Sequence, residues 1–132
     1  MNKIIIILFI ALGSLVSCKK EPGEGGFASI EGKVYVYNYD ESFTILKSQH
    51  YLPAENVFII YGDGTTVSND VKTSYDGSYK FSYLRKGKYK IFVVGKDSTQ
   101  PYKSMPKEIL VDVEIKEKKE KKILDDFIII ND

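Results

Sequence analysis

The sequence has 132 residues, with 19 basic residues, 18 acidic residues and a formal net charge of +1. That length is enough for one domain of the most common size, about 100 to 150 residues, and not for two. The balanced charge argues against a nucleic-acid partner, because such proteins carry a basic face and a high isoelectric point.

The first 17 residues are typical of an export signal. Residues 1–3 include a lysine, residues 4–12 are an unbroken apolar run, and residues 13–17 shift toward small side chains. This run is too short to span a bilayer, which takes about 20 apolar residues. We therefore assign residues 1–17 as a signal peptide.

The next residues complete a recognisable motif, Leu15-Val16-Ser17-Cys18, which resembles the lipobox of bacterial lipoproteins. In that family a diacylglyceryl group is attached to the cysteine sulfur, and cleavage falls just before the cysteine. Cys18 is the only cysteine, and an exported protein with one unpaired thiol is unusual unless that thiol is modified. The resemblance implies lipidation of Cys18 and attachment to a membrane of the bacterial cell envelope. Lys19 and Lys20 do not look like an aspartate-based inner-membrane retention signal, so we expect the outer membrane, with the domain facing the periplasm or the cell surface.

The segment after the cysteine is rich in glycine and carries no apolar side chain. Residues 19–26 contain three glycines and one proline, which favours a flexible tether over residues 18–26. The folded domain is expected to span residues 27–132.

From residue 27 onward the apolar residues recur with a period of two, which predicts strands and no helix. The first strand has two distinct faces. The core face is predicted to carry Ile30, Gly32, Val34 and Val36. The solvent face is predicted to carry Glu31, Lys33, Tyr35 and Tyr37. Further strands are expected at 56–61, 67–74, 78–83, 109–115 and 123–130, and the strand after 78–83 is expected to have Tyr89, Ile91 and Val93 on its core face.

Turn and loop signals separate these strands. Residues 40–53 read as a long polar loop, residues 116–122 as a charged tip, and Tyr75-Asp76-Gly77-Ser78 as a type I′ hairpin turn. Tyr79, Phe81 and Tyr83 are expected to share one face. Seven short strands at this spacing predict an all-β, two-sheet, Greek-key-like sandwich.

The middle of the domain also carries a longer pattern. It comprises Gly32-Lys33-Val34, then Pro53-Ala54-Glu55-Asn56-Val57, then Thr73 followed by Asp76, Gly77, Tyr79, Phe81, Leu84, Gly87, Tyr89 and Ile91. Over residues 30–94 this resembles the carboxypeptidase regulatory-like domains, which are close in fold to transthyretin (prealbumin) and to the B-type repeats of collagen adhesins. The resemblance implies the fold and says little about function.

The candidate binding residues are Tyr35, Tyr37 and Tyr39, which alternate along one face of the first strand. Rigid amphipathic rings at this spacing could stack on sugar rings or on a partner's aromatic side chains. Two other interpretations remain open: the loop at 40–53 folds over the rings, or the rings pack against cross-strand neighbours.

The sequence offers little for catalysis or metal binding. His50 is the only histidine and lies in the polar loop, and no nucleophile motif is present. The B-type adhesin repeats suggest an internal amide between Lys33 and Asn131, but the solvent-facing position of Lys33 argues against it. We expect no catalytic residue, metal or cofactor, and a binding or assembly module for an envelope protein or a glycan. The alternative is an accessory subunit of an envelope peptidase, a glycan-uptake system or an outer-membrane transporter.

Overall fold

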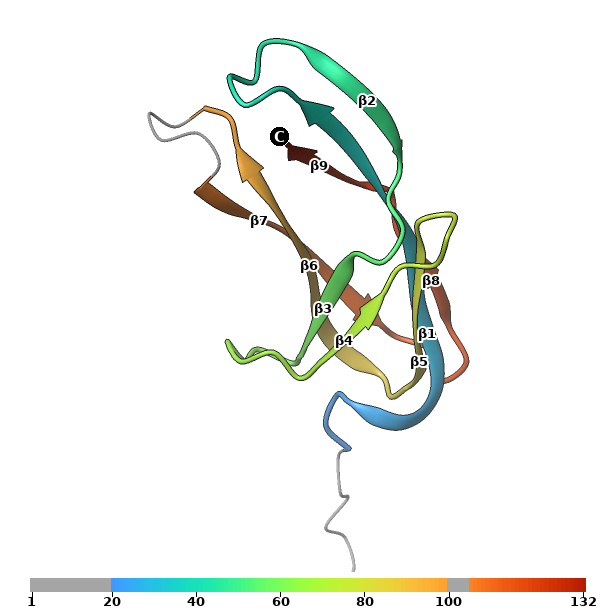
Figure 1. The fold of residues 1–132 in the computed structure, drawn as a ribbon. Coiled ribbons are helices and arrows are strands. Elements are labelled where there is room, and N and C mark those ends of the chain that lie inside the picture. Colours follow the sequence, from blue (N-terminus) through green and yellow to red (C-terminus); the bar gives the residue numbers. More distant parts are fainter. Residues whose placement is uncertain (1–19, 100–104) are drawn as a thin grey trace, which may run out of the picture.

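The computed structural model describes residues 20–99 and 105–132, which form nine strands in two sheets and contain no helix (Figure 1). No helix in this part of the chain could cross a membrane. The predicted signal peptide and Cys18 lie outside the described residues.

The first sheet is built around β1 (Glu24–Tyr39), the longest strand. The first half of β1 pairs with antiparallel β5 (Ser78–Leu84) and parallel β8 (Lys121–Ile123). The second half pairs with antiparallel β2 (Leu46–Tyr51) and parallel β9 (Phe127–Asn131). One long strand therefore connects the two ends of the sandwich.

The second sheet has four strands in the order β4-β3-β6-β7. These strands are β3 (Asn56–Tyr61), β4 (Asn69–Lys72), β6 (Gly87–Asp97) and β7 (Met105–Ile115). The β6–β7 pair is the longest, running from Gly87 opposite Ile115 to Asp97 opposite Met105.

The core lies between the sheets and follows the predicted alternation. Ile30, Val34 and Val36 of β1 are fully buried, and Tyr89, Ile91 and Val93 of β6 face them from the other sheet. The all-β, two-sheet sandwich is therefore confirmed. Its stability comes from these side chains, each of which contributes about 1.5 to 3 kcal/mol of gross apolar burial.

The prediction of seven strands is wrong by two. The expected loop at residues 40–53 contains β2, whose six residues are all exposed. No apolar alternation marks such a strand, because β2 buries no side chain and is held by pairing with β1. The expected charged tip at 116–122 contains the start of β8, which ends at residue 123, and the expected strand at 123–130 is interrupted at residues 124–126 before β9.

Two local predictions in the middle of the chain are also wrong. Tyr83 does not share a face with Tyr79 and Phe81, because it adopts a left-handed φ of 58° and is 74% exposed, while Leu84 takes the buried position. The turn before β5 is not type I′, since Asp76 does not have the positive φ that this turn requires. Gly77 alone has it, and the turn joins strands of different sheets.

The glycine-rich segment before residue 27 does not form a free tether along its whole length. β1 begins at Glu24, and Gly23 is buried. This segment needs no apolar side chain to be held, because backbone hydrogen bonds from Gly23 to Tyr89 and Arg85 fix it. The tether prediction holds at most for the residues before Pro22.

Candidate functional site

The three predicted tyrosines lie on the outer face of β1 and are half-buried. Tyr35 packs edge-on against Tyr37, with ring centroids 5.5 Å apart. Tyr35 also packs edge-on against Tyr51 at the end of β2, with centroids 5.0 Å apart. Tyr35, Tyr37, Tyr39 and Tyr51 are called the aromatic face below.

This arrangement decides between the alternatives that the sequence left open. Tyr51 is the direct cross-strand partner of Tyr35, so packing against cross-strand neighbours is confirmed. The segment at 40–53, which one alternative placed over the rings, instead contains β2, and β2 lies beside β1 in the sheet (Figure 1). Phe43 packs near Tyr39, with centroids 6.4 Å apart. Whether the aromatic face binds a ligand stays a prediction.

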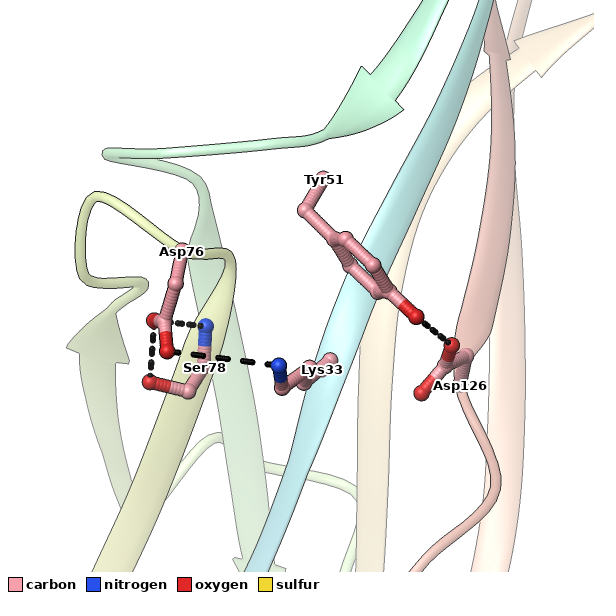
Figure 2. A network of polar contacts seen from close by, with 5 residues as sticks. All are labelled: Lys33, Tyr51, Asp76, Ser78 and Asp126. Carbon is pink, nitrogen blue, oxygen red and sulfur yellow. Dashed lines mark hydrogen bonds and ion pairs between the residues drawn. The ribbon is translucent and has the colours of Figure 1, made fainter.

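A polar cluster adjoins the aromatic face (Figure 2). The Tyr51 hydroxyl donates to Asp126 Oδ2 at 2.9 Å, and Lys33 Nζ lies 4.8 Å from the centroid of the Tyr51 ring. The same ammonium group lies 4.0 Å from Asp76 Oδ2. We call Lys33, Asp76 and Asp126 the polar cluster.

Hydrogen bonds shift the pKa of two groups at this junction, Asp76 and Tyr51. The hydroxyl of Ser78 donates to Asp76 at 2.6 Å and lowers the pKa of that carboxyl, with a further contribution from the Ser78 N–H. The hydrogen bond to Asp126 raises the pKa of Tyr51. The cluster places two carboxyl groups and one amino group beside the rings, where they can accept and donate hydrogen bonds.

One glycine brings the parts of this site together. The φ of Gly77 is 78°, and its carbonyl accepts the Val34 N–H at 2.9 Å. A Cβ at this position would lie 2.8 Å from the Val34 oxygen and 2.9 Å from Tyr51 Cβ. Only glycine fits such a close approach, and it places Asp76 against both β1 and the end of β2.

The upper edge of the site is shaped by Asp40, which follows β1. Its carboxylate accepts the N–H groups of Thr44 and Ile45, each at 2.8 Å. These bonds and the Ser42 hydroxyl lower the pKa of Asp40, and the largest effect comes from Ile45. The carboxylate thereby stabilises the tight connection that returns the chain into β2.

Two open hollows border these elements. One has a volume of about 530 Å³ and lies beside Lys33, with Ser78 and Lys80 in its wall. The other, of about 480 Å³, lies between β7 and the β8–β9 connection, with Ile109 and Phe127 in its wall. Both volumes fall within the range of ligand pockets, although such pockets normally enclose most of the ligand.

The remaining candidates from the sequence do not assemble into a second site. His50 is exposed on β2. Asn131 pairs with Asn38, five residues along β1 from Lys33, so these two residues are not neighbours and the Lys33–Asn131 amide, already disfavoured by the solvent-facing position of Lys33, does not fit the structure. Within residues 20–99 and 105–132, no group of three or more histidine, cysteine or acidic side chains could hold a metal ion.

Sequence reasoning missed Tyr51 and Asp126. Tyr51 belongs to β2, which was predicted as a loop. The polar residue Gln49, two residues earlier, lies on the same face of β2, so no apolar alternation marks Tyr51 as part of a strand. Asp126 lies 75 residues from Tyr51 in the sequence. No local pattern indicates that the two side chains meet.

Comparison with known proteins gives only a distant fold similarity. No protein-family model matches the chain, and no curated protein matches it. Among solved structures, the chain resembles a Pseudomonas aeruginosa protein for which carbohydrate binding has been proposed, with 14% identity and a TM-score of 0.47. The alignment covers 78% of this chain and 90% of that one. Similarity at this level says nothing about what this chain binds, and the resemblance to carboxypeptidase regulatory-like domains stays a prediction.

Proposed function

We propose that the chain is a lipid-anchored, non-catalytic binding module of the bacterial cell envelope, and that the aromatic face binds a glycan. The single observation that carries this proposal is the junction of the aromatic face with the polar cluster. The half-buried rings of β1 pack against Tyr51, and Tyr51 in turn lies beside Lys33 and Asp126 (Figure 2).

A sugar ring, like this surface, combines apolar and hydrogen-bonding groups. Its C–H faces are apolar and suit an aromatic ring, while its hydroxyls donate and accept hydrogen bonds. Tyr51 links the two parts, because its ring packs on Tyr35 and its hydroxyl binds Asp126. A site built from rigid aromatic side chains also loses little conformational entropy on binding.

The charge of the site narrows the glycan class. Asp76 and Asp126 are two carboxylates, and the single ammonium group of Lys33 already lies near one of them. A polyanionic glycan would be repelled by the unpaired negative charge. The proposed ligand is therefore a neutral or amine-bearing saccharide.

Lipid attachment at Cys18 is the second part of the proposal. Its support is the Leu15-Val16-Ser17-Cys18 motif and the presence of one cysteine in the whole sequence. More than one acyl chain makes anchoring stable, because each buried CH₂ contributes about 0.8 kcal/mol. The resemblance to carboxypeptidase regulatory-like domains supports a module that serves a larger envelope assembly.

Glycan binding is tested by affinity electrophoresis of the protein through neutral polysaccharides such as glucans, mannans and xylans, and by pull-down with peptidoglycan. The substitution Tyr37→Ala should weaken binding about tenfold, as expected for a residue at the centre of a binding surface. Tyr75→Ala is the matched control, since Tyr75 is 90% exposed and lies outside the aromatic face.

Equal binding by Tyr37→Ala and wild type would show that the aromatic face is not the site. Failure of every saccharide to retard the wild-type protein would overturn glycan binding. Crosslinking of the intact lipoprotein in cells would then test the alternative, an accessory subunit of an envelope peptidase, a glycan-uptake system or a transporter.

A further inference from the structure

The segment before β1 is fixed to the lower end of the sandwich as drawn in Figure 1. The Gly23 N–H donates to the Tyr89 hydroxyl at 2.9 Å, and the Gly23 carbonyl accepts the Arg85 N–H at 2.8 Å. The Tyr89 hydroxyl donates to the Arg85 carbonyl at 2.7 Å. Pro22 packs against Gly87, where an added Cβ would lie 2.4 Å from Pro22 Cγ. The chain is thus fixed from Pro22 onward.

This attachment limits the distance between the sandwich and a lipid on Cys18. Four residues of fully extended chain from Cys18 to Pro22 span at most about 14 Å. The following inference rests on the proposed lipid anchor. With the lipid in the bilayer, the end of the sandwich that holds Pro22 must lie close to the headgroups.

The same end carries exposed aromatic side chains. Phe27 is 64% exposed and Tyr83 is 74% exposed. They neighbour the paired residues Ala28 and Leu84 of β1 and β5, whose own side chains are buried. Packing within the domain therefore does not account for either ring.

Basic residues neighbour these rings in the sequence or in space, since Arg85 and Lys86 follow Tyr83 closely in the chain. Lys118 Nζ lies 5.5 Å from the centroid of the Phe27 ring. The tip at residues 116–120 has three lysines and two glutamates, and Glu120 is engaged by the Lys116 N–H at 2.7 Å and by Lys122 at 3.4 Å. We define the membrane-facing patch as Phe27, Tyr83, Arg85, Lys86, Lys118 and Lys119.

We propose that this patch docks on an anionic bilayer surface and holds the sandwich upright on the membrane. Aromatic rings are favoured at the membrane–water interface. Basic side chains near anionic headgroups each strengthen membrane binding about fivefold. Because the link to Cys18 is short, a lipid in the bilayer keeps the patch close to the membrane surface, at a high effective concentration.

The orientation has a consequence for the aromatic face. β1 runs from the patch to the opposite end of the sandwich, and the twelve steps between residues 27 and 39 span at most about 40 Å at 3.3 Å per residue. The aromatic face therefore lies toward the end of the sandwich far from the membrane, where a glycan can reach it.

The test uses the full chain, expressed in a bacterium and reconstituted in vesicles of phosphatidylglycerol and phosphatidylcholine with brominated acyl chains. The sequence has no tryptophan, so a single introduced tryptophan reports its own depth. Phe27→Trp probes the patch. Ile45→Trp is the matched control, because Ile45 is 65% exposed, close to the 64% of Phe27, and lies in the β1–β2 connection.

We expect brominated lipid to quench roughly half of the Phe27→Trp emission, as for a side chain at the headgroup boundary, and to leave Ile45→Trp unchanged. The double substitution Arg85→Ser/Lys86→Ser should reduce that quenching. Mass spectrometry of the Cys18 peptide runs in parallel. An acylated Cys18 with equal quenching, or none, at both positions would overturn the docking surface alone. A Cys18 without acyl chains would overturn the anchor and this inference together.

Discussion

Removal of the Tyr89 hydroxyl tests how the N-terminal segment is held. Tyr89 is 1% exposed, and its hydroxyl joins the Gly23 N–H to the Arg85 carbonyl. Tyr89→Phe removes the bond to the Arg85 carbonyl, with a net contribution of about 1 kcal/mol, and leaves the buried Gly23 N–H without an acceptor, which costs about 1 to 3 kcal/mol. We expect a loss of about 2 to 4 kcal/mol in the free energy of unfolding.

The structure also sets an upper limit on this loss. If the segment detaches, the Gly23 N–H reaches water, and the loss cannot exceed the free energy that holds residues 22–26 in place. Hydrogen exchange separates these cases, because detachment accelerates exchange at Gly23 while the amides of β6 keep their protection.

The assay is urea denaturation followed by tyrosine fluorescence or circular dichroism, together with amide exchange. Tyr75→Phe is the control, since Tyr75 is 90% exposed, and its unfolding midpoint should equal that of the wild type. A Tyr89→Phe protein within about 0.5 kcal/mol of the wild type, the range of neutral surface changes, with unchanged exchange at Gly23, would refute the reasoning.

Three further substitutions or titrations test individual contacts. Gly77→Ala should destabilise the protein by about 2 kcal/mol or more in thermal melts, because the added Cβ would lie 2.8 Å from the Val34 oxygen and the φ of this residue is 78°. Gly64→Ala is the control and should be neutral, because its added Cβ would have no contact closer than 3.7 Å. Tyr79→Phe should raise stability by about 1 kcal/mol, because the buried Tyr79 hydroxyl has no hydrogen-bond partner among the described residues; a lower urea midpoint would contradict this. Folding lowers the pKa of Asp40, so its contribution should be fully present above about pH 4 and be lost as pH falls through the folded pKa; a carboxyl ¹³C titration midpoint at or above 4 would contradict it.

The strands that the sequence predicted best are those with one buried and one open face. Val34 and Val36 alternate with Tyr35 and Tyr37 in β1. This period of two in the apolar residues directly indicates that the two valines are buried. The sequence of β2 shows no such alternation, because all six of its residues are exposed. A strand that buries no side chain in the core leaves no apolar alternation in the sequence.

The N-terminal attachment was missed for a related reason. Gly23 is held by its own N–H and carbonyl groups, which every residue except proline possesses. Composition therefore indicated a flexible segment, while the partner that fixes it is the hydroxyl of Tyr89, 66 residues away. The buried position of Tyr89 was predicted, but the use of its hydroxyl was not.

The candidate site could be predicted only in part. Periodicity placed Tyr35, Tyr37 and Tyr39 on one face, which the structure confirms. Tyr51 and Asp126 reach this face through the pairing of β1 with β2 and β9, and that pairing depends on contacts between distant parts of the chain. Local patterns thus identified the rings and not the polar groups beside them.

Glycan binding at the aromatic face is tested most directly by mapping amide chemical shifts in ¹⁵N-labelled protein titrated with the saccharide that gives the strongest retardation. The account predicts saturable shifts confined to the outer face of β1 and β2, around Tyr35, Tyr37 and Tyr51, and to Asp126. Shifts confined to the hollow between β7 and the β8–β9 connection, or to the end that carries Phe27, would contradict it.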